Sequence, residues 1–570
     1  MLKRGHVTLK LFNKCLLNRN YNGGLIKRGL KSNMRYPRFN VRLESLILIL
    51  AVYFSLFLNQ SLWAALLATQ SGDAFSTGLF VTAVAVGVTA LQFGILSLLI
   101  YRPIAVLTAV VILLTGVSAD FFAKKYGVFF DTSMVRNIVS TNHAEARELF
   151  TVSLFVHFLI YAVPGVLLLA CFRVKPGKLV KGLLFKLAMI LLALVIALAS
   201  FLTVFKNFSA TMRNHKEIRH LVLPMSYLIS TPRVLFESGV EAQKELTPIG
   251  LDAVKDVKPG VKPTLLVLVV GETVRAANWG LSGYSRQTTP HLAKQDVLNF
   301  PYVVSCGTNT EVSVPCMFSP WGRKDYDEKK IRSSESLLHV IARAGVPVTW
   351  IDNQSGCKGV CKGLDDIDAK TLGTPDVCPA TGCYDETLLR GLGATIKKVK
   401  GDQVVVLHQL GNHGPAYYAR YPKEFEQFKP VCASSDLGRC TQQEIFNAYD
   451  NAILYTDHIL SRAIDLLKTE NNRNVVFIYL SDHGESLGEG GFYLHGLPYA
   501  IAPKEQTRPP MLMWISDQFV KENKYSKECL AQRAKEPAHH DHLFHTVLGF
   551  MNIRTSLYEP EWDLAAKCHK

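Results

Sequence analysis

The chain has 570 residues, enough for several domains, and 48% of them are apolar. Its formal net charge of +16 could suit a nucleic-acid partner, but residues 1–42 hold 11 Lys and Arg and no Asp or Glu. The other 528 residues carry 52 basic and 47 acidic side chains, which is close to balance. This uneven distribution is typical of membrane topology, so no nucleic-acid partner is expected.

Five apolar stretches are each long enough to cross a bilayer, which takes about 20 helical residues. They lie near residues 44–68, 75–101, 103–123, 149–172 and 180–205. The first is too long for the core of a signal peptide and is interpreted as an anchor. Residues 43–205 are therefore predicted to form a five-helix transmembrane domain.

The basic residues predict the orientation of these helices. Lys and Arg cluster in residues 1–42, at Arg102 and in residues 172–181, which are the N-terminal segment and alternate loops. Since Lys and Arg favour the cytoplasmic side, residues 1–42 are expected in the cytoplasm and the C-terminal part outside. Met34 is an alternative start that the sequence does not resolve.

Cysteine usage tests this topology independently. Ten of the twelve cysteines follow residue 300. Clustered, even-numbered cysteines indicate an oxidising compartment, such as the periplasm. A zinc knuckle at 357–361 is the weaker alternative, because no matching second pair follows. The predicted disulfide pairs are Cys306–Cys316, Cys357–Cys361, Cys378–Cys383, Cys432–Cys440 and Cys529–Cys568.

Residues 206–262 are interpreted as a periplasmic connector with amphipathic helices. Apolar and basic residues alternate there at helix-like spacing. Such a helix could lie along the membrane surface or pack on the soluble domain, and both alternatives remain open.

From residue 263 to the end at 570 the pattern becomes that of an α/β domain. Continuous apolar runs of strand length occur within residues 264–272, 402–415 and 474–486. Runs without alternation indicate strands buried in a sheet with helices on both faces. In such sheets functional groups gather beyond the carboxyl ends of the strands. The side chains found there are Glu272, His413, Asp482 and His483.

Three of these side chains suggest a metal site. Zn²⁺ in catalytic sites takes three protein ligands of carboxylate or imidazole type and keeps one open position. Glu272, Asp482 and His483 supply such a set, although each alone could equally serve as a helix cap or turn former. The open position then requires an oxygen able to attack.

The loop "SCGTNTEVSVPC" at 305–316 offers that oxygen. Its hydroxyls belong to Thr308, Thr310 and Ser313. A hydroxyl is a poor nucleophile until a base or metal lowers its pKa. Spacing does not choose among the three, and all three could simply hydrogen-bond the loop.

Several long motifs resemble those of the membrane-anchored phosphoethanolamine transferases of Gram-negative bacteria. This family includes the lipid A transferases and the mobile colistin-resistance enzymes, and it has an alkaline-phosphatase-like (sulfatase-like) catalytic domain. With the five-helix anchor, the resemblance covers essentially everything after residue 35. The motifs include "GETVRAANWGLSGYSRQTTP" (271–290), "CGTNTEVSVPCMFS" (306–319), "DNQSGCKGVC" (352–361), "HQLGNHGPAYYARYP" (408–422), "YLSDHGESLGE" (479–489) and "YLHGLPYAIAP" (493–503).

The resemblance implies a role for each site residue. Thr310 matches the family nucleophile, and the zinc ligands of the family match Glu272, Thr310, Asp482 and His483. Residues that contact phosphate, or in the case of the histidines hold a second zinc, match Lys358, His413 and His495. Contacts to the phosphoethanolamine head group match Asn137, Thr141 and Glu145, which are spaced i, i+4 and i+8 along one expected helix face.

The implied function is zinc-dependent transfer of phosphoethanolamine from phosphatidylethanolamine to lipid A through a phosphoethanolamine-threonine intermediate. The consequences are a less negative cell surface and resistance to polymyxin and colistin. The expected setting is the inner membrane of a Gram-negative bacterium, with the catalytic domain in the periplasm and the protein a monomer. Alternative acceptors are a core sugar of the lipopolysaccharide or a periplasmic glucan. A phosphatase or sulfatase-like hydrolase, or a non-enzymatic scaffold, are the other classes.

The segment "AHHDHLFHT" at 538–546 is rich in histidine and suggests a metal site. We favour a structural interpretation, in which these residues begin a helix near the domain end and Asp541 caps it.

Overall fold

The computed structural model describes residues 39–569, except 71, 142, 177–178, 244 and 380–381. The chain forms two compact units, residues 1–124 with 153–229, and residues 125–152 with 230–570. Residues 125–152 belong to the same compact unit as the catalytic part of the chain. Most of the basic segment 1–42, with the alternative start at Met34, lies outside the described residues.

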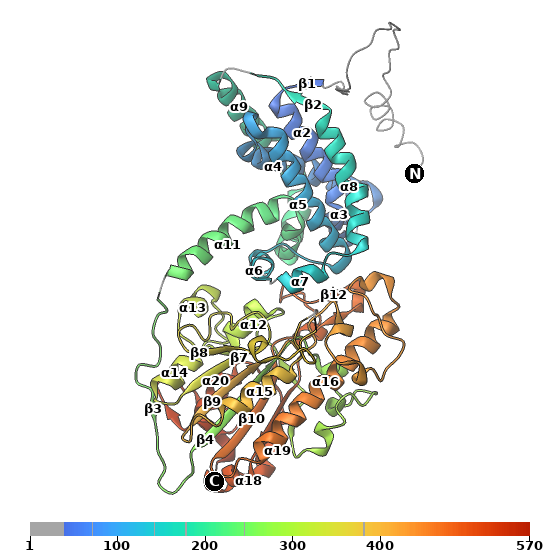
Figure 1. Cartoon of the computed structure of the whole chain (residues 1–570). Coiled ribbons are helices and arrows are strands. Elements are labelled where there is room, and N and C mark those ends of the chain that lie inside the picture. The colour runs from blue at the N-terminus through green and yellow to red at the C-terminus, as the bar shows by residue number, and fades with distance from the viewer. Residues whose placement is uncertain are drawn as a thin grey trace, which may run out of the picture. The chain divides into compact units, whose positions relative to one another are not determined.

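The first unit contains the apolar helices (Figure 1). Four helices are each long and apolar enough to cross a membrane, and a pair bent by 57° passes the same test together, which gives up to five spans in the described part of the chain. The bent pair joins α2 and α3 through a short π-helix at Phe54–Leu58. The helices are α2 (Leu43–Tyr53), α3 (Gln60–Ala68), α4 (Ala74–Leu99), α5 (Ala105–Tyr126), α8 (Val152–Ala170) and α9 (Leu179–Thr203).

A buried asparagine explains how the bend is tolerated in an apolar setting. Asn59 Nδ2 donates to the carbonyls of Phe54 (2.9 Å) and Leu223 (2.8 Å), and its Oδ1 accepts from the Leu223 N–H (2.8 Å). These bonds satisfy backbone groups at the helix break, as non-helical backbone at membrane depth requires.

The predicted connector contains two helices, α10 (Phe205–Asn214) and α11 (Met225–Gln243). Elsewhere in the N-terminal part, the short strands β1 (Phe39–Val41) and β2 (Phe172–Val174) pair in parallel.

The second unit is built on a seven-stranded sheet of order β5-β13-β10-β4-β9-β7-β8. The three strands predicted from apolar runs, β10, β4 and β9, are neighbours at its centre and run parallel. At one edge, β13 runs antiparallel to both of its neighbours, β10 and β5. The strands are β4 (Thr264–Gly271), β5 (Leu298–Phe300), β7 (Val348–Asp352), β8 (Asp365–Asp368), β9 (Gln403–His408), β10 (Asn474–Ser481) and β13 (Met511–Ile515).

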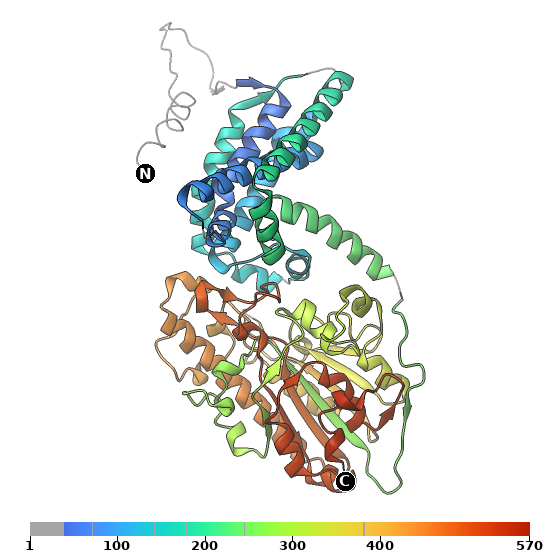
Figure 2. The ribbon, with the colours of Figure 1, turned by 180° about the vertical axis from the view of Figure 1, so that it is seen from behind.

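Helices cover both faces of this sheet (Figures 1 and 2). All eight residues of β4 are buried, and successive side chains enter opposite cores, Leu266 and Leu268 one and Leu265 and Val267 the other. The first core also takes residues from α12 (Thr310–Met317), α14 (Leu337–Arg343), α19 (Lys527–Arg533) and α20 (His542–Phe550). The second takes them from α15 (Glu386–Thr395) and α16 (Gln442–Lys468).

Shorter elements complete this unit. They are α6 (Thr132–Ser140), α7 (His143–Glu148), α13 (Glu328–Ser333), α17 (Lys504–Thr507), α18 (Asp517–Glu522), β3 (Val254–Lys255), β6 (Val303–Val304), β11 (Ser486–Leu487), β12 (Tyr493–Leu494), β14 (Ala538–His539) and β15 (Ile553–Arg554). The five predicted disulfides are all present.

Candidate active site

The carboxyl ends of the central strands bring three predicted metal ligands together. Glu272 follows β4, and Asp482 and His483 follow β10, its direct neighbour in the sheet. All three side chains are fully buried, and one donor atom from each lies within 4.8 Å of the others. His483 Nε2 lies 3.4 Å from Glu272 Oε1 and 3.3 Å from Asp482 Oδ2.

The hydrogen bonds around this cluster leave its metal-ligand atoms directed toward one another. His483 Nδ1 donates to the carbonyl of Gly484 (2.8 Å), so Nε2 is the ring nitrogen that faces the two carboxylates. Asp482 Oδ1 accepts the N–H groups of Thr273 and His483, while the buried Oδ2 has no hydrogen-bond partner in the described structure. Two carboxylates and one imidazole, with Asp482 Oδ2 left without a hydrogen bond, fit a zinc ion.

The electrostatics of the cluster are those of a site built for a cation. Burial and the charge of Glu272 raise the pKa of Asp482 to about 6. Burial alone would lower the pKa of His483, but the neighbouring carboxylates outweigh it and raise that pKa to about 10. Burial would raise the pKa of Glu272, yet its bond to His483 and the nearby histidines hold it well below its usual value. A proton on His483 is thus the positive charge that a metal would replace.

The structure separates the three candidate hydroxyls. Thr308 Oγ1 donates to the carbonyl of Leu497 (2.7 Å), and Ser313 Oγ donates to that of Asp482 (2.5 Å). Thr310 Oγ1 instead lies 3.1 Å from Glu272 Oε2, and also 3.5 Å from Nε2 of the cluster histidine. Thr310 begins α12, where Asn309 caps the helix by accepting a backbone N–H. Thr310 is therefore the hydroxyl that faces the candidate metal site.

His413 and His495 lie beside the cluster. The ring of His495 is 4.5 Å from that of His483 and 5.6 Å from that of His413, measured between centroids. His495 Nδ1 bonds to Glu485 (2.7 Å), a fully buried acid that the sequence analysis did not single out. His413 Nδ1 has no hydrogen-bond partner among the described residues, and burial lowers the pKa of His413 to about 4. The two rings therefore lie together beside the candidate metal ligands.

Lys358 also lies at the site, but the structure pairs it within the protein. Its Nζ donates to Ser355 Oγ (2.6 Å) and lies 3.2 Å from the carboxylate of Glu311, the residue after Thr310. Arg332 contacts the same carboxylate. Two cations therefore share one acid directly beside the candidate nucleophile.

The predicted head-group residues do not share one helix. α6 ends at Ser140, and Thr141 is in extended conformation, so the helix expected through Asn137, Thr141 and Glu145 is wrong in this respect. Thr141 Oγ1 bonds back to the carbonyl of Asn137 (2.8 Å). This side-chain bond from Thr141 to the last turn of α6 competes with the backbone hydrogen bonds that would continue the helix. Glu145 lies in the next helix, α7.

The segment 125–152 is nevertheless tied to the site. The negative charge of Glu145 acts on His413 and opposes the lowering of its pKa. Arg420 connects the two more directly, because it donates to Glu148 of α7 (2.5 Å) and to the carbonyl of His413 (2.6 Å). Arg420 was not singled out from the sequence.

Gln354 is a further residue that the sequence analysis missed. Its amide Nε2 donates to Glu272 Oε2 (3.2 Å), and Thr273 Oγ1 donates to the other oxygen (2.5 Å). Gln354 follows the end of β7 by two positions, so it reaches the same edge of the sheet as the metal-ligand candidates. Hydrogen bonds of this kind fix the orientation of a ligating carboxylate.

The histidine-rich segment 538–546 contacts two segments of the candidate active site through His540. His540 is fully buried; its Nε2 donates to the carbonyl of Ser481 (3.1 Å), and its Nδ1 accepts the N–H of Cys306 (3.2 Å). Ser481 precedes the ligand pair on β10, and Cys306 begins the disulfide-closed loop of the candidate nucleophile. The expected helix cap at Asp541 is wrong, because its carboxylate accepts the backbone N–H groups of Arg323 and Lys324.

Replacement of His540 by alanine is expected to slow formation of the phosphoethanolamine adduct on Thr310 about tenfold. It should also lower the melting temperature, because the buried N–H of Cys306 and the carbonyl of Ser481 lose their hydrogen-bond partner. His540→Gln keeps one acceptor and one donor and is expected to lie nearer to wild type. Differential scanning fluorimetry and intact mass spectrometry of the full chain test this. Equal values for wild type and His540→Ala would show that the bridge is dispensable.

Comparisons with known proteins identify the family of this chain. A family model described as "Sulfatase" matches residues 264–553, and one described as "Phosphoethanolamine transferase EptA/EptB" matches residues 88–238. Phosphoethanolamine transferase EptA of Escherichia coli K12 is 36% identical over 550 residues, which cover 95% of this chain and 99% of that protein. This chain belongs to the phosphoethanolamine transferase family.

Two further relatives extend the comparison. Phosphatidylethanolamine transferase Mcr-1 of Escherichia coli is 38% identical, over 73% of this chain and 80% of that protein. The solved structure of the integral membrane lipooligosaccharide phosphoethanolamine transferase A of Neisseria meningitidis matches with a TM-score of 0.87 and 35% identity, over 93% of this chain and all of that one. Like these family members, the chain is an inner-membrane protein with apolar helices and a sulfatase-like catalytic domain in the periplasm.

Proposed function

We propose that this protein transfers phosphoethanolamine from phosphatidylethanolamine to lipid A and that Thr310 carries the group between them. The observation that carries the proposal is the position of the Thr310 hydroxyl, 3.1 Å from Glu272 in a buried cluster of metal-ligand type. Relatives over almost the whole chain are named for phosphoethanolamine transfer, and the more distant Kdo(2)-lipid A phosphoethanolamine 7''-transferase of Escherichia coli is named for the acceptor Kdo(2)-lipid A.

The reaction then runs in two balanced steps. In the first, Thr310 Oγ1 forms a bond to the phosphorus of phosphatidylethanolamine and the bond to the diacylglycerol oxygen breaks. The hydroxyl loses one proton and the leaving oxygen gains one. In the second, a phosphate oxygen of lipid A attacks the same phosphorus, the bond to Thr310 breaks, and the threonine regains its proton.

Zinc is the cofactor that we propose for Glu272, Asp482 and His483. When bound there, it supplies a positive charge that favours the ionised form of a neighbouring hydroxyl. The groups that the chain itself would offer to the phosphoryl oxygens are the ammonium of Lys358, which lies beside Glu311, and the imidazoles of His413 and His495. Stabilising charge on phosphoryl oxygens is the main requirement of such a transfer.

Segment 125–152 is proposed to bind the donor head group. The ethanolamine ammonium of the donor is a cation, and Glu145 offers a carboxylate to pair with it. The negative charge of this carboxylate also opposes the lowering of the pKa of His413 by burial. Asn137 and Thr141 add polar side chains to the same segment. The head group would then lie between this segment and the phosphoryl site of the same compact unit.

The full-length protein, reconstituted with phosphatidylethanolamine, tests the proposal when lipid A, core oligosaccharide and a periplasmic glucan are offered side by side. Addition of phosphoethanolamine to lipid A, read by mass spectrometry, is the expected result. Transfer to another acceptor would change the assigned substrate, and release of free phosphoethanolamine alone would indicate a hydrolase. We further propose that the protein acts as a monomer with one zinc, and His413 and His495 could hold a second.

A further inference from the structure

A chain of ion pairs connects α6, in the proposed head-group segment, to α12, which begins with the candidate nucleophile. In α6, Arg136 Nη2 lies 3.0 Å from Glu237 Oε2 and 3.4 Å from Glu328 Oε1. Arg332 continues the chain, because its Nε lies 3.4 Å from the same oxygen of Glu328 and its Nη2 lies 3.4 Å from Glu311 Oε2. Glu311 is the second residue of α12, and all of these residues belong to one compact unit.

The cations and the acid nearest to the nucleophile are shielded from water. The side chains of Arg136, Arg332 and Glu311 are 7%, 10% and 5% exposed. Charged groups removed from water in this way are stable only while each keeps an opposite charge beside it. Arg233 differs from them, because it pairs with Glu237 (2.9 Å) but is 67% exposed. The buried pairs therefore constrain where α6 lies against α12 far more than the exposed pair does.

Packing places the same part of α6 beside the active-site loop. Met134 lies two residues before Arg136, and a Cβ added to Gly496 would come within 2.6 Å of Met134 Cε. Gly496 directly follows His495, one of the two candidate phosphate contacts. On the other side of Arg136 the next residue is Asn137, a proposed head-group contact. Arg136 thus lies between a packing contact to the site and a residue expected to bind the donor.

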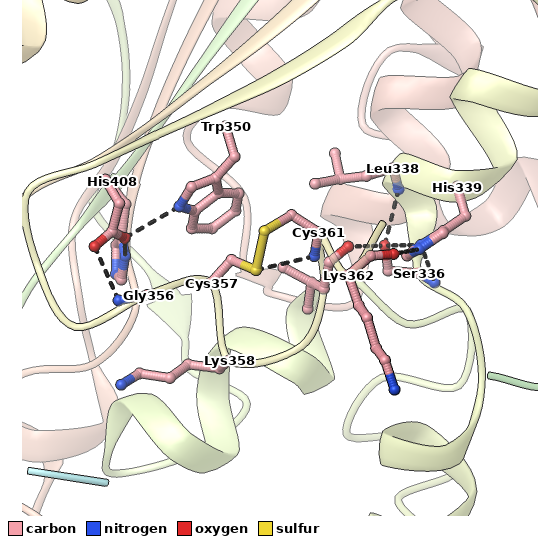
Figure 3. Close-up of a disulfide and its surroundings, with 12 residues drawn as sticks. Ser336, Leu338, His339, Trp350, Gly356, Cys357, Lys358, Cys361, Lys362 and His408 are labelled. Carbon is pink, nitrogen blue, oxygen red and sulfur yellow. Dashed lines mark hydrogen bonds and ion pairs between the residues drawn. A yellow bond between two sulfur atoms is a disulfide. The ribbon is translucent and has the colours of Figure 1, made fainter. Parts of the chain in front are cut away.

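The far end of the chain of ion pairs reaches a fixed part of the site. Glu311 also lies 3.2 Å from Lys358, which extends from the loop closed by the Cys357–Cys361 disulfide (Figure 3). This loop is bonded to the start of α14, where Ser336 Oγ donates to the carbonyl of Val360 (2.6 Å). A shift of α6 would therefore move the head-group segment relative to the phosphoryl site and leave the phosphoryl site itself in place.

We infer that Arg136 is a positioning residue for the donor. Through Glu328 and Arg332 it holds α6 against α12, so that the head-group segment binds the ethanolamine end of phosphatidylethanolamine while its phosphorus lies at Thr310. Arg136 itself touches neither the substrate nor the reacting atoms. The inference rests on the proposed function and adds to it the contact that couples donor binding to the nucleophile helix.

The test measures formation of the phosphoethanolamine adduct on Thr310 by the full-length protein in detergent micelles, over a range of phosphatidylethanolamine contents and without acceptor. Arg136→Gln is expected to raise the donor concentration for half-maximal rate about tenfold and to keep the maximal rate within about twofold of wild type. Arg136→Lys keeps the charge but not the planar fork that reaches two carboxylates, so it should lie between the two. The control Arg233→Gln removes the exposed arginine that pairs with Glu237 within α11 and should match wild type.

Two further variants show whether Arg136 acts through the chain of ion pairs. Glu328→Gln is expected to raise the half-saturating donor concentration about threefold, because Glu237 still holds Arg136, and the double variant Arg136→Gln/Glu328→Gln to equal Arg136→Gln. A merely structural role of Arg136 would lower the melting temperature and leave the half-saturating donor concentration unchanged.

An unchanged half-saturating concentration in Arg136→Gln would overturn the inference. A lower maximal rate at unchanged half-saturation would also overturn it, since Arg136 would then act on the chemistry, and so would additive effects in the double variant. If Arg136→Gln does not fold, Glu328→Gln decides, and no shift in that variant overturns the inference as well. A wild-type protein that forms no adduct would overturn the proposed function itself, whereas normal half-saturation in every variant would overturn only the role of Arg136.

Discussion

Thr310→Ala is expected to form no phosphoethanolamine adduct and to lower transfer by a factor on the order of 10³ or more. Thr308 and Ser313, the other two hydroxyls of the loop, donate to backbone carbonyls, so neither can replace Thr310 without breaking those bonds. Intact mass spectrometry after incubation with phosphatidylethanolamine measures the adduct, and transfer to lipid A measures the second step.

The matched variant Thr310→Ser keeps a hydroxyl at the same atom position and is expected to keep a measurable part of both steps. Zinc content and melting temperature of Thr310→Ala should stay close to wild type, because the threonine hydroxyl makes only long contacts to Glu272. An adduct on Thr310→Ala, mapped by peptide mass spectrometry to another residue, would assign the nucleophile elsewhere.

The centre of the fold was predictable because its strands are buried on both faces. Strand β4 reads "TLLVLVVG", and burial of every side chain in it leaves a continuous apolar run in the sequence. The edges were not predictable for the same reason. Strand β8 reads "DDID" and is largely exposed, so its sequence carries no apolar signal. It forms only because its backbone pairs with β7.

The site was predictable where the chain delivers chemistry directly from strand ends, as at Glu272, Asp482 and His483. It was not predictable where one side chain acts on another across the fold. Gln354 reaches Glu272 only because β7 and β9 bring its loop to the same edge, and nothing in the local sequence indicates that. The choice of Thr310 among three hydroxyls depended on the family resemblance, and the structure supplies a geometric reason for it.

Asp482→Asn is expected to abolish zinc binding while it stabilises the metal-free protein. Asparagine keeps the Oδ1 acceptor for the N–H groups of Thr273 and His483, but it removes a buried negative charge beside Glu272. Burial and that neighbouring charge raise the pKa of Asp482 to about 6. Because its pKa is raised, ionised Asp482 destabilises the metal-free protein at neutral pH.

The sign of the pH dependence follows from that direction. Because the folded state binds the Asp482 proton more tightly than the unfolded state, the cost is present above pH 6 and disappears as the pH falls towards 4. Melting temperatures of the chelator-treated full chain should therefore be a few degrees higher for Asp482→Asn than for wild type at pH 7, and similar at pH 4.5. Elemental analysis of untreated protein should find zinc in wild type and almost none in the variant.

Asp563→Asn is the matched control, because burial also raises the pKa of Asp563 to about 6. The carboxylate of Asp563 accepts hydrogen bonds from Tyr558 and Ala565 and is not part of the metal-ligand cluster. It is expected to keep its zinc. Zinc in Asp482→Asn at the wild-type level would exclude Asp482 as a ligand. A metal-free variant that melts below metal-free wild type at pH 7 would show that this carboxylate stabilises the fold, because the raised pKa of Asp482 predicts that its ionised form is destabilising there.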